Sequence, residues 1–588
     1  MKNRSIKQFP FYGLSILVGI IGGLGAVVFR GLIAFFHNLL FLGKFSFIYD
    51  ANQHTPASPW GALVIFVPII GAIIVVFLVK NYAPEAKGHG VPEVMDAVYY
   101  NKGIIRPVVA VIKSLASAIS IGSGGAVGRE GPIIQIGSTF GSVLGQIISM
   151  PEWQRITLIA AGAGAGIAAT FNTPIGGILF AIEIMVHEIS VRTLVPITLA
   201  SATATYIGRI FFGNHPSFII PTFEVPYFHI TNPKVLIFYV ALGILIGIVS
   251  AIYIRSIYAF EDFFEEHINN QYIRHIVGMF LVGVTFYLLM VTSGHYYIEG
   301  VGYATIQDIL MGRLPPAGFL VLLFVLKLLA VSLTLGSGAS GGIFSPALFM
   351  GATLGGAVGL VLNNIFPGIG ISAPAFAVAG MAGVVGGSTG AATAAIVMIF
   401  EMTLDYNTII PITLTVALSS GIRRLITRQT IYTLKLARRG HLMPEALRAD
   451  LSELKSIKGM MNTHLVWLPA TTTLRQLSRI VASHPDSEDF LVEQDGKLLG
   501  IVSADKALDA WGSEGENVTL DQIISSDFIL TQEDVTVFRL LSRMHEHNVS
   551  KAIVTKSPSS TAVDNIIGLV CQQQITASMM EVAAFFQQ

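Results

Sequence analysis

The sequence predicts an all-α polytopic membrane protein with an internal inverted repeat and broken helices, followed by a smaller α/β region. Composition is the first reason, because the 588 residues are 53% hydrophobic and only 12% charged, whereas soluble domains have about 25% charged residues. The second reason is a glycine-rich motif that interrupts the apolar segments twice with the same spacing. The third is a change to an ordinary, soluble composition from about residue 457.

Charge and cysteine content narrow the possible functions. Lys and Arg number 36, as do Asp and Glu, so the formal net charge is zero and we expect no nucleic-acid partner. The single cysteine, Cys571, excludes an intramolecular disulfide. The basic N-terminus leads into an apolar run without a small-residue cleavage site, which predicts a retained first membrane helix.

The first half of the membrane region, at about residues 10–213, contains two kinds of helix. Plain apolar spans are expected at residues 11–42 and 60–80, and residues 173–190 and 193–213 complete this half. Residues 107–121 and 125–147 are too short or too rich in glycine for plain spans. They predict broken helices, which a bilayer tolerates only where protein or water satisfies the backbone. The Ala- and Gly-rich residues 155–172 predict a helix-contact face.

A polar loop near residues 214–232 leads to the second half, at about residues 233–432. Its apolar segments are expected at residues 235–260, 275–293, 316–335 and 373–402. Residues 373–402 repeat residues 155–184 with a small insertion, which sets Glu183 opposite Glu401. Matching halves with glycine-broken helices predict an inverted repeat with a binding site near the bilayer midplane.

The repeated motif carries the chemistry. Its first copy runs from Gly122 to Pro132 and contains Arg129 and Glu130, and its second copy runs from Gly336 to Pro346. Ionisable groups at membrane depth are costly and generally face a cavity, a partner or a transport path. Glycines expose backbone N–H groups, and a helix N-terminus attracts anions. The motif therefore predicts an anion path with a carboxylate inside it.

Structural roles compete with these assignments. Arg129 and Glu130 could form a buried ion pair that stabilises a turn. Glu183 and Glu401 are more often groups that satisfy helix termini. The lysines that precede the two motif copies, Lys113 and Lys327, fit either a counter-charge near the path or a paired structural role.

Two other functions compete with anion transport. Gly338-Ala339-Ser340-Gly341 fits the motif of an intramembrane serine protease. Such a protease needs a base in a neighbouring span, and no histidine lies clearly mid-span in the second half. A cation transporter would need several intramembrane acids, whereas glycine-flanked helix N-termini favour anions. We therefore predict a transport protein and no enzyme.

The C-terminal part divides into a linker and a soluble region. Residues 421–439 are basic, so this end and the N-terminus are expected in the cytoplasm, with the spans in the cell (inner) membrane. We place the membrane domain at 1–435, a cytoplasmic linker at 436–456 and the soluble region at 457–588. The soluble region contains two units, each with an apolar strand before a helix.

Several motifs together resemble the CLC family of chloride channels and proton-coupled anion exchangers. Gly128-Arg129-Glu130-Gly131-Pro132 matches the family's GREGP, and Gly342-Ile343-Phe344-Ser345-Pro346 matches its GxFxP. Phe171-Asn172-Thr173-Pro174 and Tyr432 match two further family positions. This resemblance covers about residues 10–435, and the tail resembles a pair of CBS domains.

The resemblance implies roles for these residues. Backbone N–H groups of Ile343 and Phe344, and of Arg129 to Gly131, would bind chloride or a similar small anion together with the Tyr432 hydroxyl. Glu130 would be the gating carboxylate, because a carboxylate competes for a site built for an anion. The resemblance also implies a homodimer in a lipid bilayer.

The sequence departs from the family pattern at two positions. His89 replaces the usual serine of the inner gate and could donate an N–H to the anion, so another anion such as fluoride or nitrate stays open. Ile184 stands where exchangers place the inner proton-relay glutamate. We therefore expect channel-like or weakly proton-coupled transport, with an antiporter that uses a non-standard proton route as the alternative.

The CBS-like tail offers a weak nucleotide motif. Ser503-Ala504-Asp505 is one residue shorter than the pattern that holds the ribose of adenine nucleotides, and Cys571-Gln572-Gln573-Gln574 lacks an acid. Adenine nucleotide binding at Ser503 and Asp505 and a purely structural, dimerising pair both remain open. No metal or other cofactor is expected.

Overall fold

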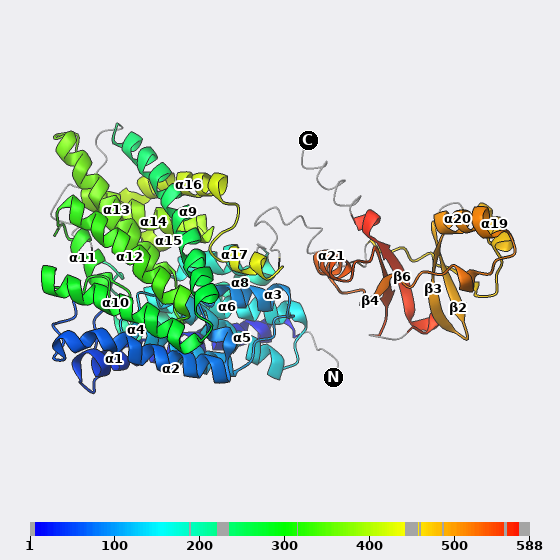
Figure 1. Ribbon diagram of the computed structural model, residues 1–588, viewed down its shortest axis with the longest axis horizontal. Helices are drawn as coiled ribbons and strands as arrows, with labels where there is room; N and C mark the ends of the chain where they lie inside the picture. The colour runs from blue at the N-terminus through cyan, green and yellow to red at the C-terminus, as the bar shows by residue number, and fades with distance from the viewer. Residues whose placement is uncertain are drawn as a thin grey trace. The chain divides into compact units, whose positions relative to one another are not determined.

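The computed structural model describes residues 6–186, 190–219, 234–313, 315–441, 457, 460–484, 487–557 and 561–575. The chain forms two compact units, Met1–Met443 and Pro444–Gln588 (Figure 1). The first unit is helical, and the second combines strands with helices. Within the described residues, 8 helices are long and apolar enough to cross a membrane, which agrees with the predicted polytopic fold.

The first half of the membrane unit contains helices α1 to α8. They are α1 (Gln8–Leu42), α2 (Val67–Tyr82), α3 (Val91–Tyr99), α4 (Val108–Gly122), α5 (Glu130–Ile147), α6 (Glu152–Phe171), α7 (Pro174–Phe180) and α8 (Val191–Phe212). The predicted span at residues 60–80 begins as a 3₁₀ turn, Gly61–Phe66, before α2. Helix α7 continues as a π-helix over Ala181–Val186.

The second half repeats this order. Its helices are α9 (Val235–His267), α10 (Gln271–Ser293), α11 (Tyr303–Leu310), α12 (Ala317–Ser337), α13 (Phe344–Ile365), α14 (Ala373–Thr389), α15 (Ala392–Thr403) and α16 (Ile409–Ile426). A short helix, α17 (Thr433–Arg438), follows. Most of the predicted loop between the halves lies outside the described residues, since 220–233 are not among them.

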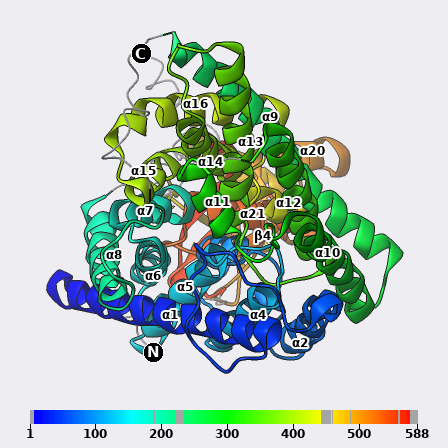
Figure 2. The same cartoon turned by 90° about the vertical axis from the view of Figure 1, so that its left-hand side faces the viewer.

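The packing of the two halves follows a two-fold relation. Within the halves, α5 packs on α6 as α13 packs on α14, and α1 packs on α8 as α9 packs on α16 (Figure 2). Between the halves, equivalent helices contact each other: α2 with α10, α5 with α13, and α7 with α15. Self-pairing of equivalent elements is what a two-fold axis produces. The predicted repeat of broken helices is therefore confirmed.

Equivalent residues break the helices. Asn172 ends α6 with φ of 60°, and Gly390 ends α14 with φ of 80°. Glycine adopts this left-handed backbone at no steric cost, and asparagine tolerates it better than most residues. Pro174 then begins α7, where a missing N–H costs nothing.

Two glutamates cap the helices that follow these breaks, each in the opposite half. Glu183 accepts the backbone N–H groups of Thr393 and Ala394 at 3.1 and 2.8 Å, at the start of α15. Glu401 accepts those of Ile175 and Gly176 at 3.1 and 2.7 Å, at the start of α7. A carboxylate at a helix N-terminus satisfies unpaired donors and complements the helix dipole. Both glutamates therefore have the structural role.

Two buried lysines have an equally symmetric role. The Nζ of Lys113 donates to the carbonyl oxygens of Ala86 and Gly88 at 3.0 and 2.7 Å. The Nζ of Lys327 donates to those of Ile298 and Gly300 at 2.8 and 2.7 Å. Both side chains are fully buried. Each lysine thus holds the loop that precedes α3 or α11 by its carbonyl groups, because buried polar groups need partners.

The second unit contains two three-stranded sheets of the same topology. The strands are β1 (Val466–Pro469), β2 (Asp489–Gln494), β3 (Lys497–Ser503), β4 (Phe528–Gln532), β5 (Lys551–Thr555) and β6 (Ile566–Cys571). In each sheet the first two strands are parallel and the last two antiparallel. Helix α19 (Leu474–Ser483) connects β1 to β2, and α21 (Val537–Glu546) connects β4 to β5. The positive φ of Asp495 and Gly496 suits the tight hairpin between β2 and β3.

The two sheets share one interface. Apolar residues of both sheets pack together there, namely Leu491, Leu498, Ile501, Ile553, Ile566 and Leu569. At its edge Asp489 forms an ion pair with Lys551 and accepts a 3.4 Å hydrogen bond from the Cys571 thiol. Burial and the negative charge of Asp489 raise the pKa of this thiol to about 12. Cys571 is therefore a protonated, structural residue at neutral pH.

The capping role of Glu401 leads to a stability prediction. Glu401→Leu removes two charge-assisted hydrogen bonds and leaves two N–H groups of α7 without partners, so we expect about 2–4 kcal/mol lower stability. Glu401→Gln keeps one oxygen acceptor and should lose less. The measurement is the apparent Tm in detergent, with the exposed Glu266→Leu as control. An equal Tm for the two leucine variants would contradict the capping role.

Candidate anion site where the glycine loops meet

The two glycine motifs contact each other directly. The N–H of Gly128 donates to the carbonyl of Gly342 at 2.7 Å, and the N–H of Gly342 donates to the carbonyl of Gly128 at 2.6 Å. These glycines occupy the same place in the two copies, so the pair is reciprocal. It joins the loops that lead into α5 and α13 inside the buried core.

A third loop completes this meeting point. The carbonyl oxygen of His89 lies where a side chain on Gly131 would begin, at 2.1 Å from an added Cβ, and the Cα of Gly342 lies 3.2 Å from the same point. No larger residue fits at Gly131. The loops before α3, α5 and α13 therefore converge closely enough for their backbone groups to serve one site.

Two helices, α13 and α5, begin at this point. Phe344 starts α13 and Ile343 caps it, and both are almost fully buried. The first N–H groups of a helix have no partner within it, and the helix dipole adds partial positive charge there. The start of α5 at Glu130 adds a second such end. This arrangement can hold an anion with backbone donors alone.

The Glu130 carboxyl group itself accepts a hydrogen bond from one of these backbone N–H donors. Its Oε2 accepts the backbone N–H of Ser345, in the first turn of α13, at 3.2 Å. Its Oε1 accepts the Tyr303 hydroxyl at 2.7 Å and also the Ser345 hydroxyl. The Glu130 side chain is only 1% exposed. The Glu130 carboxyl group therefore lies at the start of α13, bonded to this helix end and to two hydroxyl groups.

Arg129 does not pair with Glu130 in the described part of the chain. Its guanidinium lies over two aromatic rings, 5.2 Å from the centroid of Tyr303 and 5.8 Å from that of Phe171. Such cation–π contacts are favourable for a desolvated arginine. The alternative of an Arg129–Glu130 ion pair is therefore wrong, because the two charges have separate partners.

His89 and Tyr432 lie together on another side of the site. Their ring centroids are 5.8 Å apart, and Tyr432 also has an edge contact with Phe180. The His89 Nε2 lies 3.3 Å from the Tyr258 hydroxyl, which donates to the Ile431 carbonyl at 2.5 Å. The Nδ1 of His89 is buried without a partner in the described residues. A buried polar atom without a partner is costly, so this nitrogen is a candidate anion donor in the tautomer that carries its proton on Nδ1.

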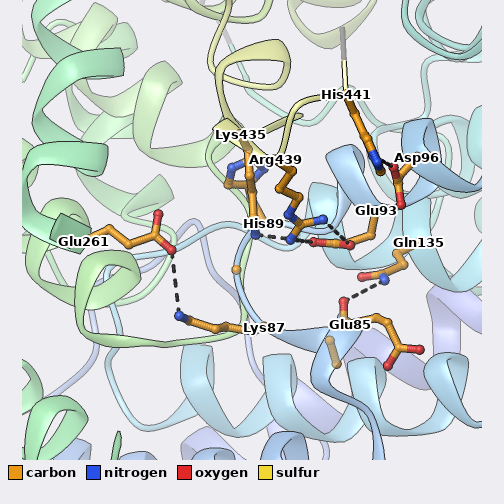
Figure 3. A network of polar contacts seen from close by, with 12 residues as sticks. Glu85, Lys87, His89, Glu93, Asp96, Gln135, Glu261, Lys435, Arg439 and His441 are labelled. Carbon is orange, nitrogen blue, oxygen red and sulfur yellow. Dashed lines mark hydrogen bonds and ion pairs between the residues drawn. The ribbon is translucent and has the colours of Figure 1, made fainter. Parts of the chain in front are cut away.

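Cationic groups surround His89 (Figure 3). Lys435 lies 3.4 Å from Glu93, and Arg439 donates to both oxygens of Glu93 at 2.7 and 3.0 Å. Burial would raise the pKa of Glu93, but the hydrogen bond from Arg439 and the charge of Lys435 lower it overall. The ionised Glu93 thus holds two cations of the C-terminal segment near the inner loop, where their charge favours an anion.

The next carboxylate on α3 makes a similar contact. His441 bonds through Nδ1 to Asp96 at 2.5 Å (Figure 3). Its ring stacks on Tyr100 with centroids 4.1 Å apart. The chain after Tyr432 is therefore attached to α3 at two points. This attachment positions Tyr432 relative to His89.

Two further residues of the sequence analysis, Ile184 and Ser340, have clear surroundings. Ile184 is 5% exposed and packs in the apolar core. Its segment is a π-helix, and the neighbouring Glu183 accepts the backbone N–H groups at the start of α15. The Ser340 hydroxyl donates to the Ala86 carbonyl at 2.7 Å and contacts the Ser117 hydroxyl. Those partners supply no base for a protease. The other nearby acid, Glu188, lies outside the described residues.

The predicted nucleotide residues begin helix α20 (Ala504–Glu514). The Ser503 hydroxyl accepts the backbone N–H of Lys506, so it caps this helix, and Asp505 lies in the first turn. Serine is a preferred residue at a helix N-cap, so this structural role explains the presence of Ser503 without a ligand. Adenine nucleotide binding at these residues stays a prediction.

Sequence reasoning missed Tyr303 and Ser345. Ser345 lay inside a quoted motif but had no assigned function. Tyr303 follows Gly302, which repeats Gly90 in the other half, and this position was the available signal. What the pattern could not reveal is that the first residue of α11 reaches across to Glu130.

Comparisons with known proteins agree with this geometry. The family model for the voltage gated chloride channel matches residues 71–424, and that for the CBS domain matches residues 454–512. The H(+)/Cl(-) exchange transporter ClcA of Vibrio cholerae serotype O1 is 31% identical over 446 residues, 74% of this chain and 91% of that protein. ClcA of Yersinia pestis biovar Antiqua is 33% identical over 366 residues, 62% of this chain and 75% of that protein.

Solved structures share the fold. A slow cyanobacterial Cl−/H+ antiporter superimposes with a TM-score of 0.63 at 23% identity, over 74% of this chain and 99% of that chain. A CLC-type fluoride/proton antiporter gives 0.59 at 23%, over 73% and 99%. A eukaryotic CLC transporter gives 0.62 at 21%, over 96% and 97%. Together with the family match and the 31% identity to ClcA, the converging glycine loops make this chain a member of the CLC family, a multi-pass membrane protein built for anion transport.

Proposed function

We propose that this protein conducts chloride through the meeting point of the glycine loops, and that Glu130 gates the path. The observation that supports this proposal most directly is the hydrogen bond from the Ser345 N–H, at the start of α13, to the Glu130 carboxylate. A carboxylate and a chloride ion compete for the same donors, so protonation or displacement of Glu130 opens the path. The names of the ClcA relatives support chloride as the anion.

The opposite constriction is assigned to His89 and Tyr432. Both side chains are buried, from different halves of the chain, and their rings lie 5.8 Å apart. The unpartnered His89 Nδ1 supports a donor role toward the central anion. A histidine here, in place of a serine, supports a different anion preference as the alternative. The solved fluoride/proton antiporter of the same fold makes fluoride the first anion to compare.

Transport is proposed to be channel-like or weakly coupled to protons. Ile184 carries no proton, and Glu183 is held by the N–H groups of Thr393 and Ala394. The relatives named as H(+)/Cl(-) exchangers support the rival mechanism, an antiporter with a non-standard proton route. The resemblance to the family and the basic segment at residues 421–439 also lead us to propose a location in the inner membrane, with both ends of the chain in the cytoplasm. The resemblance further suggests a homodimer, and the mass of the protein in detergent tests this oligomeric state.

The gate assignment predicts the effect of Glu130→Gln. This variant imitates the protonated state and cannot become a competing anion. A single titrating gate changes flux by up to about tenfold per pH unit, and in the variant that slope should fall toward zero. The measurement is chloride efflux from proteoliposomes at several pH values. Glu266→Gln, an exposed glutamate of α9, is the control, and an unchanged slope in Glu130→Gln would refute the gate.

The inner constriction predicts a second variant. Removing both side chains in His89→Ala/Tyr432→Ala should raise passive chloride leak, because the constriction widens. It should also weaken chloride binding at least about tenfold, because hydrogen bonds to the anion are lost. Calorimetry in detergent measures the affinity, with the exposed pair His267→Ala/Tyr82→Ala as control. Equal affinity in both double variants would exclude His89 and Tyr432 from the site.

The coupling proposal is tested with sealed vesicles. An imposed chloride gradient should move few or no protons uphill, since the described residues place no free carboxylate at the Ile184 position. Stoichiometric uphill proton movement would contradict the channel-like mechanism. In that case loss of the movement in His89→Ala would identify the histidine as part of the alternative proton route.

A further inference from the structure

Tyr303 makes a contact that anion binding by backbone groups does not require. Its hydroxyl oxygen lies 2.7 Å from Glu130 Oε1 and 2.8 Å from Ser345 Oγ, and the two hydroxyls both reach Oε1. We call these three oxygens, Glu130 Oε1, Tyr303 Oη and Ser345 Oγ, the outer hydroxyl cluster. Within this cluster, the two hydroxyl groups stabilise the ionised carboxylate, since each can donate its one proton to a carboxylate oxygen.

The fold holds Tyr303 rigidly in this place. The residue begins α11 directly after Gly302, whose φ is 76° and where an added Cβ would meet the Phe349 ring at 2.6 Å. The Tyr303 ring has an edge contact with Phe218, with centroids 5.2 Å apart, and lies under the guanidinium of Arg129. Only 2% of Tyr303 is exposed. A donor fixed by packing loses little entropy when it bonds the carboxylate.

We propose that Tyr303 is a positioning residue that latches Glu130 at the start of α13, the place of the proposed gate. This inference rests on the proposed gate and adds to it a side chain that sets how easily the gate leaves. Hydrogen bonds to a carboxylate favour its ionised form and are among the stronger ones in proteins. The latch therefore opposes both protonation of Glu130 and its displacement by chloride.

Other groups also act on Glu130 and have to stay unchanged in the test. Besides its chain neighbour Arg129, the charged or titratable groups that interact with it are Lys327 of α12, Tyr253 of α9, Tyr432 and Tyr303 itself. Lys327 is bonded to two carbonyls and Tyr253 donates to the Ile343 carbonyl at 2.9 Å. Among them only Tyr303 has a hydrogen bond to the carboxylate in the described residues.

The test is Tyr303→Phe, which keeps the ring and removes the hydroxyl. Because the ionised gate loses a hydrogen bond, it should be protonated at higher pH. We expect the pH of half-maximal chloride flux to rise by about one unit. The chloride concentration for half-maximal flux at pH 7 should fall about tenfold, since the carboxylate competes less well. Ser345→Ala removes the other hydroxyl and should shift both quantities in the same direction.

Matched variants separate the latch from the gate. Tyr296→Phe removes another buried tyrosine hydroxyl, which accepts the Ser58 N–H at 3.0 Å, and should leave the pH profile unchanged. In the Glu130→Gln background, Tyr303→Phe should produce no further pH shift. If Glu130→Gln flattens the profile but Tyr303→Phe and Ser345→Ala leave it unmoved, the latch is refuted and the gate stands. A shift that persists in the Glu130→Gln background also refutes the latch. An unflattened Glu130→Gln profile refutes the gate and the latch that rests on it.

Discussion

The reciprocal backbone pair between Gly128 and Gly342 is the contact on which the rest of the membrane unit depends. It ties together two loops that interrupt helices inside a membrane, where unpaired N–H and C=O groups are expensive. Once these groups satisfy each other, the next N–H groups, at the starts of α5 and α13, are left to face the same small space. The same backbone hydrogen bonds that stabilise the two helix breaks therefore also create the candidate anion site. A side chain at Gly131 would collide with the His89 carbonyl and push the loops apart.

The charged residues at the helix breaks and at the glycine loops fall into two groups with different purposes. Lys113, Lys327, Glu183 and Glu401 each satisfy backbone groups at a break in the fold, and they do so in symmetric pairs. Such a charged side chain has a structural role, because its removal would leave the backbone groups at the break without a partner. Glu130 breaks the symmetry, since Phe344 occupies its place in the other half. In the proposed mechanism, only the half that carries this carboxylate supplies the gate.

The same asymmetry separates the two ends of the proposed path. At one end, hydroxyl groups and a helix N-terminus hold a carboxylate that belongs to the protein. At the other end, the rings of His89 and Tyr432 narrow the path, and the ion pairs of Lys435 and Arg439 with Glu93 attach the following segment to α3. In the proposed mechanism, the first end is controlled by a charge that can be neutralised, and the second by side-chain size and by positive potential. This proposal gives anion preference and gating separate physical origins.

Much of this protein could be predicted from its sequence. Apolar run lengths located the spans, two copies of one glycine motif revealed the repeated halves, and Glu130 stood out because a carboxylate at membrane depth has few explanations. Matching positions also set Glu183 opposite Glu401 and Lys113 opposite Lys327. These features were accessible because they depend on local spacing and on comparison of one half with the other.

Only the tertiary structure decided which atoms meet. The exchange of caps between Glu183 and α15 and between Glu401 and α7, and the separation of Arg129 from Glu130, required contacts across more than 200 residues or across a packed aromatic cluster. The contact of Tyr303 with Glu130 spans 173 residues. Sequence patterns record the periodicity of one segment at a time, whereas a hydrogen bond depends on the direction of both partners. That direction is set by how the helices pack, and no single segment contains it.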